Sequence, residues 1–237
     1  MQVAPLAVRA AIHASPCCPV RVVFLSYLKP IDAFVLRRLD AAWPVTGVLR
    51  VVPDGTGPRA KPQPLVVKAA RRLQSTWYNV YYDQLDRRLA RELFPEGAPA
   101  ADAPLRGGAP IVDVPRAQLH DAATLAQLDA WAPDVIVVSG APILRPALFE
   151  KAPVAVNLHL GMAPDYRGEH TLFWPLLRGD YDRIGATLHR IDRGVDTGAV
   201  LVRVYPELAP DDTEMTLMAK SLRMLSSALI DFVTDLS

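Results

Sequence analysis

Three polar residues in the second half of the chain have types and a spacing that suit attack on a carbonyl group. Asn157 and His159 are two positions apart where an apolar run ends, so in a strand both side chains point to the same side. Asp196 lies in a glycine-containing stretch that is typical of a tight turn. An amide and a protonated imidazole can donate to a developing oxyanion, and a carboxylate can orient the imidazole and favour its charged form. Each residue alone is typical of an ordinary turn or rim, so the hypothesis depends on all three.

Apolar runs and helical spacing predict the elements that must position these residues. Short apolar runs typical of strands buried on both faces lie at 21–26, 45–52, 111–114, 134–139 and 154–157. Helices are expected at 31–39, 65–93, 117–131, 171–177 and 213–233, and a strand pair at 184–191 and 200–205. This alternation predicts an α/β fold with a doubly wound, open, mostly parallel sheet. Such sheets bind ligands beyond the carboxyl ends of their strands, where Gly140 and Asn157 both fall.

Length and composition limit the classes of protein to consider. The 237 residues, 51% hydrophobic and 22% charged, fit one large domain at 20–237 after a disordered or irregular extension at 1–19. A net charge of +1 gives no overall attraction to nucleic acid or membrane. The adjacent Cys17 and Cys18 provide no disulfide framework, which agrees with a reducing, cytoplasmic location. We expect neither a signal peptide nor a membrane span, since no stretch reaches eighteen apolar residues.

The three polar residues belong to a longer pattern that resembles the formyltransferase superfamily. The pattern comprises Asn157-Leu158-His159, Pro164-Asp165-Tyr166-Arg167-Gly168, Trp174-Pro175-Leu176-Leu177-Arg178-Gly179-Asp180, Gly185-Ala186-Thr187-Leu188-His189 and Asp196-Thr197-Gly198. The upstream residues 137–140 and 143–144 are similar to the superfamily's folate-binding strand and loop. Its members include glycinamide ribonucleotide, methionyl-tRNA, amino-sugar and hydroxyornithine formyltransferases, and formyltetrahydrofolate deformylase.

This resemblance implies a fold, a co-substrate and a set of site residues. Residues 20–237 would form a formyltransferase catalytic domain with a Rossmann-like fold. The co-substrate would be 10-formyltetrahydrofolate, with no metal, and Asn157, His159 and Asp196 would be catalytic. His189 would support Asp196. The implied cofactor-binding residues are Pro142, Ile143, Leu144, Pro164, Asp192 and Val195.

Departures from the family pattern bear on the acceptor of the formyl group. Leu160–Pro164 stands where the common form is Pro-Ser-Leu-Leu-Pro, and Ser26–Pro30 lacks the glycines with which glycinamide ribonucleotide enzymes cradle a phosphate. Methionyl-tRNA enzymes carry a further C-terminal barrel, whereas this sequence ends at Ser237. We therefore expect a small-molecule amine acceptor, either an amino sugar on a nucleotide or a modified amino acid, and do not expect nucleic acid as a partner. The oligomeric state is left open, with a homodimer among the alternatives.

Two other functions remain open alongside the transferase. Water as acceptor would give a 10-formyltetrahydrofolate hydrolase, and loss of the chemistry would leave a non-catalytic folate-binding module. A basic stretch without acids is most typical of a solvated loop and helix start, and a patch that recognises the phosphates of a nucleotide-linked sugar is the alternative; its members are Arg59, Lys61, Lys68, Arg71 and Arg72. The aromatic pairs at 77–78 and 81–82 are more typical of a core or a dimer face than of base stacking.

Overall fold

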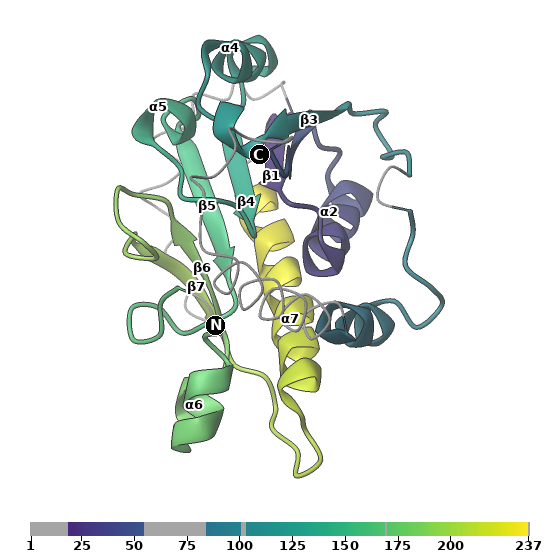
Figure 1. Cartoon of the computed structure of the whole chain (residues 1–237), viewed down its shortest axis with the longest axis vertical. Coiled ribbons are helices and arrows are strands. Elements are labelled where there is room, and N and C mark those ends of the chain that lie inside the picture. Colours follow the sequence, from purple (N-terminus) through teal and green to yellow (C-terminus); the bar gives the residue numbers. More distant parts are fainter. Residues whose placement is uncertain (1–18, 55–83, 101–102, 169, 237) are drawn as a thin grey trace, which may run out of the picture.

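The sheet has the predicted α/β architecture. The computed structural model describes residues 19–54, 84–100, 103–168 and 170–236. In this part of the chain a seven-stranded sheet has the order β3-β2-β1-β4-β5-β6-β7 (Figure 1). The strands are β1 (Val22–Ser26), β2 (Gly47–Val52), β3 (Ile111–Pro115), β4 (Val135–Ser139), β5 (Val154–His159), β6 (Ala186–Arg190) and β7 (Val200–Val204). β1 to β5 are parallel, and β6 and β7 join antiparallel, which confirms an open, mostly parallel sheet.

Helices cover both faces of the sheet because its central strands are apolar on both sides. The labelled helices are α2 (Pro30–Ala42), α4 (Ala122–Trp131), α5 (Pro146–Phe149), α6 (Phe173–Arg178) and α7 (Glu214–Asp235), with short 3-10 turns η1 (Arg116–Gln118) and η2 (Tyr181–Arg183), and residues 84–93 are also helical. α2 and α7 pack together over one face, where one hydrophobic core lies. α4 and α5 supply the second core on the other face.

Several element boundaries differ from those expected. The strand expected at 154–157 continues to His159, because β6 pairs with it as far as His159 opposite Thr187. The helix expected from residue 117 begins at Ala122, after η1. α5 was not expected. Of the helix expected at 65–93, residues 84–93 are helical and the rest lies outside the described residues. The extension up to residue 18, the basic stretch and the aromatic pairs also lie outside them.

The chain order creates a switch point between β1 and β4. From β1 the chain first builds outward through β2 and β3, and it then returns to build β4 and β5 on the other side. The connections therefore diverge at the carboxyl ends of β1 and β4 and leave room for a ligand. Ser26 and Ser139 lie side by side there, and Asn157 lies opposite His189. Within the described ranges, no helix is long and apolar enough to cross a membrane.

Candidate active site

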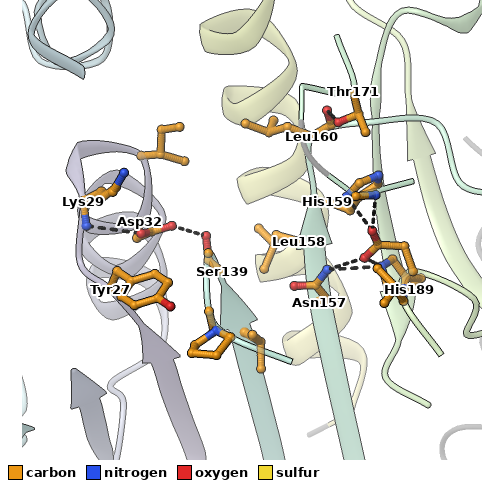
Figure 2. Close-up of a pocket in the computed structure, with 18 of the residues that line it drawn as sticks. Tyr27, Lys29, Asp32, Ser139, Asn157, Leu158, His159, Leu160, Thr171 and His189 are labelled. Carbon is orange, nitrogen blue, oxygen red and sulfur yellow. Dashed lines mark hydrogen bonds and ion pairs between the residues drawn. The ribbon is translucent and has the colours of Figure 1, made fainter. Parts of the chain in front are cut away.

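Asn157 and His159 project from the same side of β5 at its carboxyl end. Their two-residue spacing in a strand places both side chains on one face, as expected. Antiparallel pairing with β6 then brings His189 directly opposite Asn157. Figure 2 shows the side chains of Asn157, His159 and His189 gathered at this end of the sheet. His159 is only 6% exposed, so its ring is largely removed from water.

Asp196 contacts all three of these side chains. Its backbone has a φ of 49°, a left-handed conformation that is uncommon for residues other than glycine but is tolerated by aspartate. One carboxylate oxygen, Oδ1, lies 3.3 Å from Asn157 Nδ2 and 3.4 Å from His189 Nε2. The other, Oδ2, lies 3.5 Å from His159 Nδ1 and accepts from the amide of Gly168 at 2.8 Å. The structure thus brings the three residues of the sequence hypothesis into one network.

The tautomer of His189 follows from its backbone contact. His189 Nδ1 lies 2.8 Å from the carbonyl oxygen of Arg190, which can only accept, so Nδ1 carries a proton. In the neutral ring Nε2 then accepts from Asn157 Nδ2 at 3.2 Å, whereas in the charged ring it donates to Asp196 Oδ1 at 3.4 Å. Asn157 therefore uses its two N–H groups on His189 and Asp196. Both bonds are longer than the usual ~2.9 Å, so either can be exchanged at modest cost.

Opposing effects act on the charge of His159. Burial lowers the pKa of His159 below its ordinary value, and this outweighs the Asp196 carboxylate and the Tyr166 hydrogen bond, which both raise it. His159 Nε2 donates to the carbonyl of Tyr166 at 2.8 Å. The neutral ring therefore leaves a lone pair on Nδ1, beside Asp196. Asp196 does favour the charged form of this imidazole, as the sequence-based hypothesis has it, but desolvation is the larger effect, so the site favours a neutral ring that can take up a proton.

The pKa of Asp196 itself moves in the opposite direction to that of a simple buried acid. Burial raises the pKa of Asp196, but hydrogen bonds from His189 and Gly168 and the nearby histidines outweigh burial and leave the pKa below its ordinary value. Asp196 is therefore a carboxylate at neutral pH. A fixed negative charge beside Nδ1 would stabilise His159 at the moment when that ring accepts a proton.

The titration of His159 tests how burial and the Asp196 charge together set the pKa of its ring. We expect its ring to titrate below pH 6.5, and the Asp196→Asn substitution to lower its pKa further, because the variant loses the charge that favours the imidazolium while burial remains. NMR titration of the ring Cε1 proton measures both values. An unchanged or higher pKa in the variant would show that Asp196 does not act on His159.

These groups open into a cavity of about 720 Å³ at the switch point, within the size range of small-molecule sites. Five of the six cofactor-binding residues implied by the sequence line it: Pro142, Ile143, Leu144, Asp192 and Val195. Pro164 does not; it is exposed, and its carbonyl accepts from Arg167. The loop that follows β4 and the turn that precedes β7 therefore face one cavity, with Asn157 and His159 between them.

Other lining residues were not identified from the sequence. On the β1 side they include Tyr27, Lys29 and Asp32, and α7 adds Glu214, Met218 and Leu222. The α7 residues are four apart and so share one face of the helix. This spacing could have identified them from the sequence only if the position of α7 beside the cavity had been known. Asp32 could have been noticed as an acid in the first turn of a helix at a strand's carboxyl end.

The histidines and Asp196 do not form a metal site. Among the residues that the structure describes, no group of three or more His, Cys, Asp or Glu side chains could hold a metal ion. The network consists instead of hydrogen bonds and ion-pair contacts, and that arrangement suits proton transfer and oxyanion stabilisation.

Comparisons with known proteins agree with this geometry. A family model described as formyl transferase matches residues 91–233. The methionyl-tRNA formyltransferase of Desulfotalea psychrophila is 37% identical over 114 residues, which cover 47% of this chain and 35% of the relative. That of Nitrosococcus oceani is 30% identical over 170 residues, or 70% of this chain and 52% of the relative. The chain thus spans about half or less of these relatives' lengths.

A solved structure shares the fold. The phosphoribosylglycinamide formyltransferase from Streptococcus pneumoniae superposes with a TM-score of 0.58 at 20% identity, covering 92% of this chain and 98% of the other. This likeness supports the Rossmann-like formyltransferase fold that the sequence predicted.

The expectation that nucleic acid is not a partner is wrong in the light of these comparisons, because the curated relatives are methionyl-tRNA formyltransferases. That expectation used the net charge and the point where the sequence ends. Neither of these two features describes the charge of the local surface around the cavity.

Proposed function

The chain belongs to the formyl transferase family, and we propose that it transfers a formyl group from 10-formyltetrahydrofolate to an amine. The observation that carries this proposal is the network of Asn157, His159 and Asp196 that lines the switch-point cavity. In the proposed site the pterin of the folate lies between the loop at 140–144 and the turn at 192–196. Its formyl group then faces the end of β5.

The reaction would proceed through a tetrahedral intermediate. The amine nitrogen forms a bond to the formyl carbon, and the carbonyl oxygen becomes an oxyanion. Asn157 gives up one of its two long hydrogen bonds and donates to that oxygen. His159 takes the amine proton on Nδ1, where Asp196 stabilises the charge. The same proton then passes to the folate nitrogen as its bond to the formyl carbon breaks.

Methionyl-tRNA is the first acceptor to consider, because the curated relatives are named methionyl-tRNA formyltransferases. An amino sugar on a nucleotide or a modified amino acid is the second. The specific observation behind the second is the Leu160–Pro164 segment, which departs from the common family form beside the proposed site.

Folate binding is the experiment that tests the core of the proposal. We expect 5-formyltetrahydrofolate to raise the melting temperature, since a ligand at 100 times its Kd stabilises the folded protein by about 2.7 kcal/mol. The measurement is a thermal-shift titration, with the free glutamate and p-aminobenzoate parts of the ligand as controls. A melting temperature that stays constant up to millimolar folate would remove the proposal.

The acceptor is identified by a parallel turnover assay. Protein and 10-formyltetrahydrofolate are incubated with methionyl-tRNA, a nucleotide-linked amino sugar, hydroxyornithine or buffer alone. Formyl-methionyl-tRNA as the main product would identify the first acceptor. Release of formate at the full rate in buffer alone would identify a hydrolase instead.

A further inference from the structure

A second buried carboxylate faces the cavity from the side opposite Asp196. Asp32 lies in the first turn of α2 and is 4% exposed. Its Oδ1 accepts from the hydroxyl of Ser139 at 2.7 Å, and its Oδ2 accepts from the backbone amide of Lys29 at 3.2 Å. The hydroxyl of Ser26 also bonds to it. Figure 2 shows Asp32 and Ser139 joined across the gap between α2 and β4.

This carboxylate packs against the backbone where the 140–144 loop leaves β4. Gly140 has a φ of 52°, and a Cβ added there would lie 2.9 Å from Asp32 Oδ1. The carbonyl of Gly140 accepts from the amide of Tyr27 at 3.0 Å. The first residue of the loop is therefore held on two sides, by the Asp32 carboxylate and by the chain after β1.

We propose that Asp32 is a positioning residue whose carboxylate, through Ser139 and Gly140, holds the 140–144 loop in the conformation that receives the folate. This inference rests on the proposed function, because the loop is the proposed pterin site. Asp32 touches the loop's anchor points and not the reacting atoms, so it should act on folate affinity more than on the chemical step.

The charge of Asp32 is set by burial. Burial raises the pKa of Asp32 to about 7, against hydrogen bonds from Ser139, Ser26 and Lys29 that lower it. The Lys29 ammonium is more than half exposed and lies 3.7 Å from the Asp86 carboxylate, so it compensates little. Besides Lys29 and Asp86, the titratable groups that line the cavity with Asp32 are Tyr27, His159, His170, His189, Asp192, Asp196 and Glu214.

Ionisation should strengthen this anchor. The carboxylate can accept from all three donors, whereas a protonated acid must give up part of that capacity. Wild-type affinity for folate should therefore rise as the pH increases from about 6 to 8. Burial lowers the pKa of His159, which moves its titration towards the acid end of this window.

Asp32→Asn tests the proposal, with Asp40→Asn as its matched control. Asp40 lies on the same helix, is also 4% exposed, and accepts from backbone amides, including that of Arg106 at 2.5 Å. It does not line the cavity. Isothermal titration with 5-formyltetrahydrofolate at pH 6, 7 and 8 measures affinity, and turnover separates KM from kcat.

Asp32→Asn should raise the Kd for folate about tenfold at pH 8, as expected for losing a charge-assisted hydrogen bond. It should also abolish the rise in affinity between pH 6 and 8 and change KM for folate more than kcat. Asp40→Asn should keep both the affinity and its pH dependence.

The outcomes separate the two proposals. Wild-type protein that binds no folate overturns the proposed function. Wild-type protein that binds folate while Asp32→Asn and Asp40→Asn show the same Kd and pH dependence overturns only the role of Asp32. If Asp32→Asn does not fold, the Ser139→Ala variant is measured in its place. A higher Kd for 5-formyltetrahydrofolate supports the proposal, and an unchanged Kd overturns it.

Discussion

The Asp196→Asn substitution is expected to lower kcat for formyl transfer by about 10²–10⁴ while leaving the fold intact. The carboxylate orients Asn157 and His189 through Oδ1 and faces His159 through Oδ2. An asparagine of the same shape removes the charge that stabilises a protonated His159. It also places an N–H group at a position where the carboxylate now accepts a hydrogen bond from Asn157 or from Gly168. Both the proton transfer and the position of Asn157 should therefore be impaired together.

A matched control separates this effect from a general loss of stability. Asp129→Asn removes another carboxylate, which is exposed and paired with Lys151 at 2.6 Å. Exposed ion pairs contribute about 1 kcal/mol or less, so this variant should keep normal turnover. Steady-state kinetics and melting temperatures of both variants provide the comparison. Turnover by Asp196→Asn within a few fold of wild type would exclude the proposed role of the carboxylate.

The sequence predicted those parts of the site that depend on local pattern. The apolar runs at 134–139 and 154–157 identified the two central strands, because strands buried on both faces are continuously apolar. The two-residue spacing of Asn157 and His159 determined that they share a side. The position of Asp196 in a turn followed from its glycines, although the left-handed φ that aims its carboxylate did not.

Features that depend on strands and helices far apart in the chain could not be predicted. Asp32 reaches the cavity because β1 and β4 are neighbours, and Glu214 reaches it because the first turn of α7 lies at the same end of the sheet. The direction of the pKa shift of His159 could not be predicted from the sequence either. It depends on how deeply the ring is buried, and burial is a property of the packed molecule.

The His159→Ala substitution is also expected to have a large effect, lowering kcat by about 10²–10⁴. In the proposed mechanism this ring carries a proton from the attacking amine to the leaving nitrogen, and no other described side chain lies in the same contact with Asp196 Oδ2. Because the lost group is an imidazole on the wall of an open cavity, added imidazole should restore part of the activity. Rescue should follow the neutral form of the added imidazole as the pH is raised.

The same variant shows whether His159 and Asn157 act as one unit. Both contact Asp196, so each substitution should already disturb the other residue's position. The double variant Asn157→Ala/His159→Ala should therefore lose much less than the product of the two single losses, since residues of a shared catalytic network are non-additive. Rates of the four proteins with one acceptor, under single-turnover conditions, give the coupling. Losses that multiply would mean that the two side chains contribute independently, and normal turnover by His159→Ala would assign proton transfer to another group.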